Sequence, residues 1–165
     1  MRRALVLSIV LLAACESADP TPVDVANATY KVDQRTVTLV SGVFEEPAAP
    51  GSAAKATTRL HEKRAAGDLN ADGRPDAAVV LTSSGSGSGT FWYVSVVLGT
   101  GAGKGTATNA VLLGDRIAIE AVKVDGGTVV VETLERRAGE PFTTVPSVKA
   151  VRTFQVKGGA LTEVK

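Results

Sequence analysis

Oxygen-bearing side chains recur at alternate positions in one short run of this chain. Asp68, Asn70 and Asp72 are separated by single residues, and Asp76 follows at the ninth position of the run. Calcium takes six to eight hard oxygen ligands at about 2.3–2.6 Å, and a short loop supplies them when alternate residues point inward. We therefore predict a structural Ca²⁺ site with side-chain ligands from Asp68, Asn70, Asp72 and Asp76 and a backbone carbonyl ligand from Arg74.

The same run has a second, metal-free interpretation. Asp, Asn and Gly are ordinary turn residues, because Asp and Asn side chains hydrogen-bond their own backbone and Gly73 permits a sharp turn. The loop also departs from an EF-hand, since its twelfth position is Val79 and the residues after it are typical of a strand. Both interpretations stay open, although three neighbouring carboxylates repel one another unless a cation binds.

The elements around this run belong to a single exported β domain. Residues 1–14 have the form of a signal peptide, with Arg2 and Arg3 before an apolar stretch that is shorter than the roughly 20 residues needed to span a bilayer. Residues 15–28 are polar and proline-broken, which predicts a flexible tether. Residues 29–165 are enough for one domain with a core of its own.

Cys15 is the single cysteine of the chain, so a disulfide within it is excluded. The stretch Leu12-Ala13-Ala14-Cys15 resembles the lipobox of bacterial lipoproteins. That resemblance implies acylation of Cys15, export, and attachment to the cell envelope through a lipid anchor. Glu16 stands where an Asp retains proteobacterial lipoproteins at the inner membrane, which favours the outer membrane in a host that has one. The alternative is a leftover cysteine in an uncleaved leader.

The charge of the chain excludes one class of partner. Loss of the leader takes two of the 18 basic side chains, against 17 acidic ones, and no basic run remains. Nucleic acid is therefore not an expected partner. The membrane is the partner that the lipobox implies, and the sequence identifies no protein or surface partner.

Short β-branched runs alternate with glycine-rich breaks, and none has a sustained helical period. This pattern predicts an all-β domain of mostly antiparallel meander strands, as a sandwich or a curved sheet. Asp125-Gly126-Gly127 and Lys157-Gly158-Gly159 are typical of tight hairpin turns, and Glu45–Lys55 of a loop or an irregular sheet edge. The expected strands are Thr29–Val32, Arg35–Val40, Thr57–Arg64, Ala77–Thr82, Thr90–Leu98, Ala107–Leu113, Ile117–Val124, Thr128–Leu134, Val148–Val156 and Leu161–Val164.

Phe91-Trp92-Tyr93 opens the expected central strand. Alternation puts Tyr93 and Val97 on one face and Trp92 and Val94 on the other, so both faces are apolar. We interpret this strand as covered on both sides. An aromatic platform for a ligand is the alternative, but it would not need the opposite face to be apolar.

The calcium run lies within a wider resemblance. The pattern DxNxDGxxD leading into a strand looks like the calcium loop of FG-GAP/VCBS repeats, but one copy cannot build a propeller of about four to eight blades. From about Val40 to Val151 the chain resembles a group of uncharacterised bacterial envelope proteins with GDLNGDGxxD, GGSGTFYY, LLGDRI and RxxGEP segments. The resemblance implies a shared fold and the same metal loop, with Ala71 at the usual glycine; it implies no substrate.

Four charged residues of those segments form a second candidate site. Asp115, Arg116, Arg137 and Glu140 are expected at turns of the sheet, where they would gather into a polar cluster for a ligand or a protein. The structural alternative, which we favour, is that Asp115 caps its turn and the arginines pair with carboxylates to hold neighbouring hairpins.

Signatures of catalysis are sparse. His61 is the single histidine, no GxSxG elbow accompanies it, and Gly99–Thr106 lacks the residues of a phosphate loop. Glu45 and Glu46 are the remaining candidates, as general acids of a hydrolase. We therefore expect a non-catalytic envelope protein with a calcium loop, with a binding module second and a carboxylate-based hydrolase last.

Overall fold

The computed structural model describes residues 22–85 and 87–164. The expected signal peptide, Cys15 and Glu16 lie outside these residues. Within them the chain is all-β, as predicted, and no helix has the length and apolar character to cross a membrane.

The strands of the described residues are paired antiparallel throughout. Most neighbours in the sheets are also neighbours in the chain, which confirms the meander. The strands are β1 (Thr29–Val32), β2 (Arg35–Thr38), β3 (Val43–Pro47), β4 (Lys55–Gly67), β5 (Asp76–Ser84), β6 (Phe91–Gly101), β7 (Lys104–Ala107), β8 (Val111–Asp115), β9 (Ala118–Asp125), β10 (Thr128–Glu135), β11 (Val148–Lys157) and β12 (Ala160–Val164).

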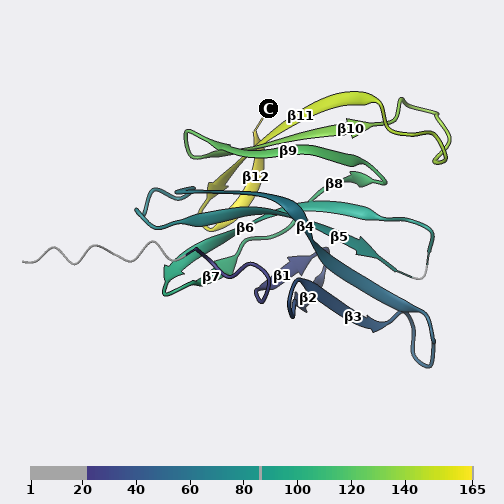
Figure 1. The fold of residues 1–165 in the computed structure, drawn as a ribbon, viewed down its shortest axis with the longest axis horizontal. Coiled ribbons are helices and arrows are strands. Elements are labelled where there is room, and N and C mark those ends of the chain that lie inside the picture. The colour runs from purple at the N-terminus through teal and green to yellow at the C-terminus, as the bar shows by residue number, and fades with distance from the viewer. Residues whose placement is uncertain (1–21, 86, 165) are drawn as a thin grey trace, which may run out of the picture.

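The strands form three layers (Figure 1). The middle layer is a six-stranded sheet in the order β3-β4-β5-β6-β7, with β8 also paired to β6. A four-stranded sheet in the order β12-β11-β10-β9 covers one of its faces, and the β1–β2 hairpin covers the other. The middle sheet is therefore the scaffold from which the loops project.

Each face of the middle sheet has its own apolar core. Trp92 and Val94 pack toward the four-stranded sheet, where Phe154 is fully buried. Tyr93 and Val97 pack on the opposite face, against the hairpin. The prediction of a central strand covered on both sides is thus confirmed for β6, and its aromatic residues belong mainly to these cores.

Two expected elements differ from the structure. The segment expected as a loop or sheet edge begins with an edge strand, because Val43–Pro47 pairs with β4, and the loop itself is confined to residues 48–54. The single strand expected over Ala107–Leu113 is wrong. It breaks between β7 and β8 because the Thr108 hydroxyl accepts the Val96 N–H at 3.1 Å and the Asn109 side chain bonds both backbone groups of Leu161.

The packed part of the chain starts before β1, within the segment expected as tether. Val25 is 6% exposed and joins the core under the hairpin, with Val23 packed beside it. The Tyr30 hydroxyl donates to the Val25 carbonyl at 2.7 Å, and burial of that hydroxyl raises the pKa of Tyr30. Residues 22–28 therefore lie against the domain.

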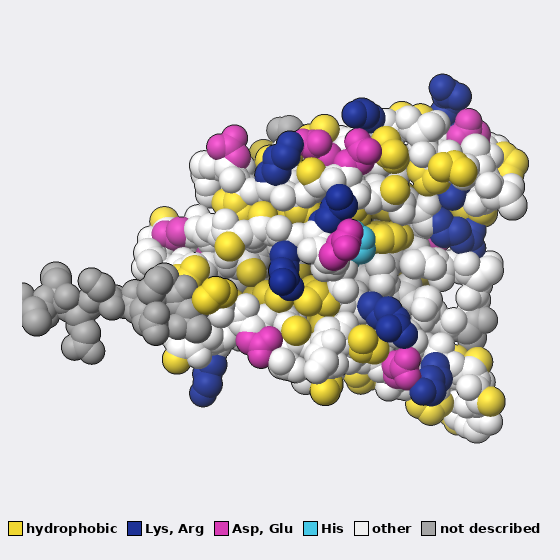
Figure 2. All heavy atoms as spheres, viewed as in Figure 1, with side chains coloured by type: hydrophobic (Ala, Val, Ile, Leu, Met, Phe, Trp, Pro, Cys, Tyr) yellow, Lys and Arg dark blue, Asp and Glu magenta, His cyan; other side chains and the backbone are white. Residues whose placement is uncertain are grey.

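The charged surface has no dominant sign on the face drawn in Figure 2. Basic and acidic side chains are interspersed over both sheets, with apolar side chains visible between them. Several are paired across neighbouring strands, as Lys123 is with Glu132 and Arg152 with Glu163. This distribution agrees with the near-neutral balance of the sequence.

Candidate functional site

The loop between β4 and β5 carries the predicted calcium ligands. β4 ends at Gly67 and β5 begins at Asp76, so the intervening residues reverse the chain between paired strands. The reversal uses left-handed backbone at Ala71 (φ 61°) and Gly73 (φ 78°). Glycine adopts this conformation without strain, whereas a Cβ, as at Ala71, makes it costly.

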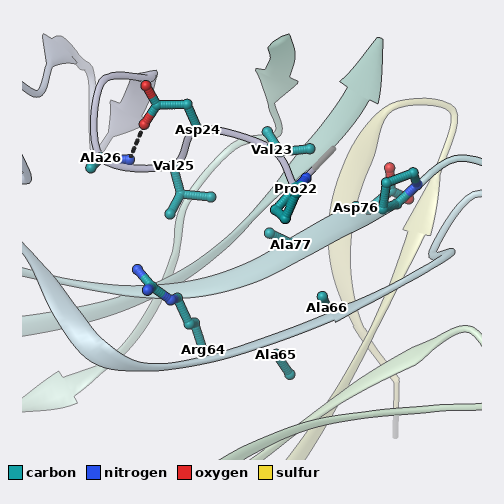
Figure 3. Close-up of a pocket in the computed structure, with 11 residues that line it drawn as sticks. Pro22, Val23, Asp24, Val25, Ala26, Arg64, Ala65, Ala66, Asp76 and Ala77 are labelled. Atoms are coloured by element: carbon teal, nitrogen blue, oxygen red, sulfur yellow. Dashed lines mark hydrogen bonds between the residues drawn. The ribbon is translucent and has the colours of Figure 1, made fainter. Parts of the chain in front are cut away.

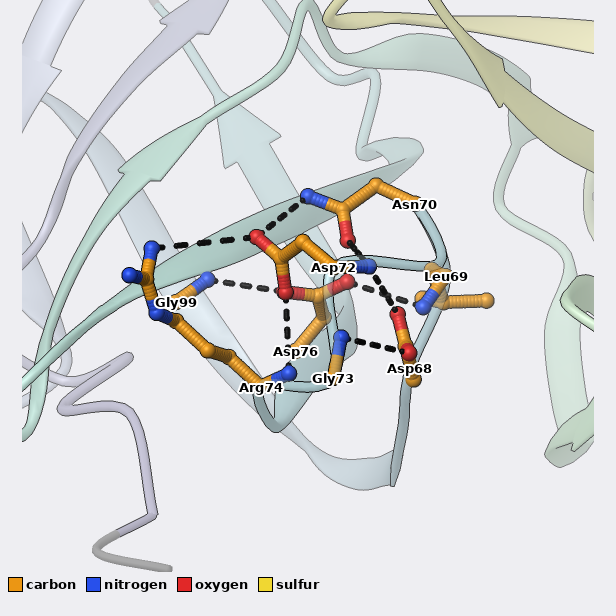
Figure 4. A network of polar contacts seen from close by, with 8 residues as sticks. All are labelled: Asp68, Leu69, Asn70, Asp72, Gly73, Arg74, Asp76 and Gly99. Carbon is orange, nitrogen blue, oxygen red and sulfur yellow. Dashed lines mark hydrogen bonds and ion pairs between the residues drawn. The ribbon is translucent and has the colours of Figure 1, made fainter. Parts of the chain in front are cut away.

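The three alternating side chains turn toward the backbone of their own loop (Figure 4). Oxygens of Asp68 and Asn70 both accept the Asp72 N–H, at 3.2 and 3.0 Å. The second Asp68 oxygen accepts the Gly73 N–H at 2.9 Å, and one Asp72 oxygen accepts the Arg74 N–H at 2.9 Å. Asp68, Asn70 and Asp72 are therefore brought together at the tip of the loop, held by N–H donors.

Asp76 has different surroundings from the other three side chains. It is 1% exposed, and its two oxygens accept the Leu69 N–H and the Gly99 N–H, each at 2.8 Å. Leu69 is itself buried in the core between the sheets. Asp76 thus fastens the base of the loop to β6, and each of its oxygens keeps a further lone pair.

Within the described residues, one ion pair involves a carboxylate of this loop. Nη1 of Arg74 lies 4.0 Å from an Asp72 oxygen, and both side chains are partly exposed. Hydrogen bonds from the Asn70 amide and from the Arg74 N–H lower the pKa of Asp72, so this carboxylate is ionised at neutral pH. Among the residues that the structure describes, no three His, Cys, Asp or Glu side chains form a group that could hold a metal ion. Asn70, one of the three donors at the tip of this loop, is not of these residue types.

Gly99 is a residue of this site that the sequence did not single out. A Cβ on Gly99 would lie 2.3 Å from the Pro75 carbonyl oxygen, so only glycine lets β6 approach the base of the loop this closely. That approach is what places the Gly99 N–H on Asp76. The glycine-rich segment at the end of β6 gave no local signal for this contact, because its partner is 23 residues away.

The second candidate cluster surrounds the turn between β8 and β9. An Asp115 oxygen accepts the Thr90 N–H at 2.9 Å. Arg116 has φ 50°, and its guanidinium donates to the Ser88 carbonyl and hydroxyl, at 2.5–3.0 Å and 3.0 Å. The same guanidinium lies 3.8 Å from the Asp115 carboxylate. These two side chains hold the β5–β6 connection against the turn.

Phe142 continues this cluster into the loop between β10 and β11. The Arg116 guanidinium lies 4.4 Å from the centre of its ring, and that of Arg136 lies 5.9 Å from it. Arg136, which the sequence did not single out, also donates to the carbonyls of Thr144 and Arg116. Arg137 and Glu140 pair with each other at 3.5 Å, and 74% of the Arg137 side chain is exposed.

The catalytic candidates have structural partners. The His61 ring packs edge-to-face on Trp92, and burial lowers the pKa of this histidine. Glu45 pairs with Lys55 and Arg59, which lowers the pKa of its carboxyl, the opposite of what a general acid requires. Glu46 pairs with Arg35.

Comparisons with known proteins give the site no precedent. No family model, no curated protein and no solved structure matches the chain. Its function is therefore inferred from its own residues.

Proposed function

We propose that this chain is a non-catalytic, lipid-anchored protein of the bacterial cell envelope whose Asp68–Asp76 loop binds a structural Ca²⁺. The observation that carries the calcium proposal is the gathering of Asp68, Asn70 and Asp72 around the N–H groups of one turn. Oxygen donors held in this way keep lone pairs for a hard cation, because each N–H bond occupies one lone pair alone.

The donor set fits calcium in its chemistry. The side chains of Asp68, Asn70 and Asp72, with the Arg74 carbonyl and the remaining lone pairs of Asp76, are all oxygen donors, which is the ligand type that Ca²⁺ prefers. A bound ion would lower the repulsion between the carboxylates. Because every ligand comes from the protein, we propose that it stabilises the β4–β5 hairpin and has no catalytic task, with an affinity of about 10⁻⁴–10⁻³ M, as in extracellular modules.

The proposed anchoring rests on the lipobox-like stretch that ends at Cys15. Mass spectrometry of the chain expressed with its leader in a bacterium tests it. We expect acyl chains on Cys15, a new N-terminus at this residue, and recovery in the membrane fraction. Cys15→Ala should lose all three. An unmodified Cys15 in wild-type protein would contradict the anchor.

A binding module at the Asp115–Arg116 turn is less well supported. The donors of Arg116 are used by Ser88, and the Asp115 carboxylate by Thr90. A ligand there would have to displace these bonds. We therefore retain the structural interpretation for this cluster.

Calorimetric titration of the soluble chain 16–165 with Ca²⁺ tests the loop. Every contact described above lies within residues 22–164, so this chain retains both cores. We expect one site in wild type, none in Asp72→Ala, and an unchanged site in Asp125→Ala, which removes an exposed carboxylate at the β9–β10 turn. Equal binding by the two variants would show that the loop is not the site.

A further inference from the structure

The long strand β4 is interrupted by a bulge near its middle. Pairing with β5 stops after Leu60 and resumes at Arg64, so residues 61–63 stand opposite a single residue of β5. A bulge takes its extra residues out of the ladder, and their backbone groups then need other partners. One such partner is local, because the Lys63 N–H donates to Nδ1 of His61 at 3.2 Å. The histidine ring therefore closes the bulge from within the strand.

The bond between Lys63 and His61 exists in one protonation state of the ring. A neutral imidazole has one N–H donor and one acceptor nitrogen, whereas an imidazolium has two donors and no acceptor. Protonation would put a hydrogen on Nδ1, facing the Lys63 N–H. The bond would then be lost, and the Lys63 donor would be left without a partner at a partly buried site. Neutral His61 is thus required for the closed bulge.

The surroundings of the ring favour its neutral form. His61 packs edge-to-face on Trp92 of β6, with 5.1 Å between the ring centres. Burial lowers the pKa of His61, and of the two charged neighbours in sequence Glu62 raises this pKa while Lys63 lowers it. The net direction is downward from the ordinary value of a histidine.

The neighbouring strands add little charge around this histidine. Val80 of β5 stands opposite the bulge and Trp92 of β6 contacts the ring, and neither side chain titrates. Pairing with β3 ends at Arg59, whose guanidinium is paired with Glu45. The charged residues of β9, which packs on the end of β4, are Glu120, Lys123 and Asp125, of which the first two pair with Lys149 and Glu132. Among the described residues, Glu62 is the carboxylate that favours the charged ring.

The part of β4 after the bulge contacts both neighbouring layers. On one face, a Cβ on Gly67 would lie 2.6 Å from a methyl group of Val124, so β4 and β9 are in close contact there. On the other face, Arg64 and Ala66 line a pocket of about 620 Å³ that Val25 also lines (Figure 3). The bulge therefore separates the part of β4 that pairs with β3 from the part that contacts β9 and residues 22–26.

We propose that His61 is an acid-sensitive switch in the middle sheet, in which protonation of the ring opens the bulge and loosens residues 64–67 from β9. The inference depends neither on the calcium loop nor on acylation of Cys15. Because the pKa of His61 in the folded protein lies below its ordinary value of about 6.5, the stabilisation by the neutral ring is complete above that pH. It is lost as the pH falls from about 6.5 to the lowered pKa.

NMR of the soluble chain 16–165 with chelator tests the switch. His61 is the single histidine, so its ring titrates as one resonance, and we expect a midpoint below about 6.5. After correction for the intrinsic rate, the Lys63 amide should exchange about fivefold faster at about pH 5 than at about pH 7, which corresponds to the loss of one hydrogen bond. The internal control is the Val131 amide on β10, which is paired on both sides and should keep its protection.

His61→Asn is the matched variant. An asparagine side chain accepts the N–H two residues on, as Nδ1 of His61 does, but it does not titrate. Exchange of the Lys63 amide should therefore be equal at the two pH values in this variant. The same acid response in His61→Asn, a wild-type midpoint at or above about 6.5, or an equal acceleration at Val131 would overturn the proposal. The midpoint and the comparison of Lys63 with Val131 need wild-type protein alone, so they decide the question even if the variant does not fold.

Discussion

The β4–β5 loop and the β8–β9 turn both reverse the chain beside acidic side chains, but they differ in how many carboxylates share each guanidinium. Each reverses the chain with a non-glycine residue in the left-handed region, Ala71 at φ 61° and Arg116 at φ 50°. At the turn, the Asp115 carboxylate faces a guanidinium that is itself bonded and stacked on Phe142. In the loop, Asp68, Asp72 and Asp76 have N–H donors and share a single guanidinium, that of Arg74, which pairs with Asp72 at 4.0 Å.

From this difference we infer which of the two acidic turns would gain more from a cation supplied from outside the chain. A carboxylate beside a guanidinium is stabilised by charge, whereas backbone N–H groups supply dipoles and leave the mutual repulsion of neighbouring carboxylates in place. In the β8–β9 turn, the Asp115 carboxylate already has a charged partner within the chain. The β4–β5 loop is the region where an added divalent cation has the most repulsion to relieve.

The largest effect is expected at the base of the loop. Asp76→Ala leaves the Leu69 and Gly99 N–H groups without their acceptors, in a buried setting where each costs about 1–3 kcal/mol. We expect the free energy of unfolding to fall by about 3–5 kcal/mol in urea titrations followed by circular dichroism. Asp72→Ala, at the exposed tip and without calcium, is the control and should lose far less. Equal losses would mean that Asp76 does not fasten the loop.

Arg116→Gly tests how much the Arg116 side chain stabilises the β8–β9 turn. The glycine relieves the left-handed backbone but removes the bonds to Ser88 and the contact with Phe142. We expect a net loss of about 1–2 kcal/mol in the same assay, because charged hydrogen bonds and the cation–π contact outweigh the relief of strain. Arg137→Gly, on an exposed side chain, is a control for loss of charge. A stabilised Arg116→Gly would show that this side chain does not brace the turn.

Ala71→Gly should change stability in the opposite direction. The Ala71 side chain is exposed and its backbone is left-handed, so glycine should raise the free energy of unfolding by about 0.5–1 kcal/mol. Thermal melts of the two glycine variants side by side measure the contrast. If Ala71→Gly also destabilises, the loop backbone is not strained in the way that its φ angle indicates.

Local patterns in the sequence predicted most of the fold. The Asp-Gly-Gly and Lys-Gly-Gly turns place positive φ angles between β-branched runs, and hairpins form there in the structure. The break between β7 and β8 was missed because its cause, the bonding of Asn109 to Leu161, joins residues 52 positions apart. Packing of Val25 under the hairpin was missed for a different reason, because a short polar segment has no periodicity that indicates a buried residue.

The residues of the candidate site could be predicted from the sequence, but the different structural role of each residue could not. Alternating oxygen donors identify the tip of the loop, because each contact there spans two to five residues. Asp76 looks like one more member of that series. Its second contact reaches β6, so its role in fastening the loop depends on how β4, β5 and β6 stack, which spacing alone does not reveal.

Thermal unfolding of the soluble chain 16–165 with calcium, magnesium or chelator tests the central claim most directly. At calcium ten times its dissociation constant, we expect about 1.4 kcal/mol of stabilisation, a smaller effect of magnesium, and none in Asp72→Ala. Arg116→Gly should keep the full calcium response, since its turn needs no ion. An identical melting temperature with calcium and with chelator in wild-type protein would contradict the account.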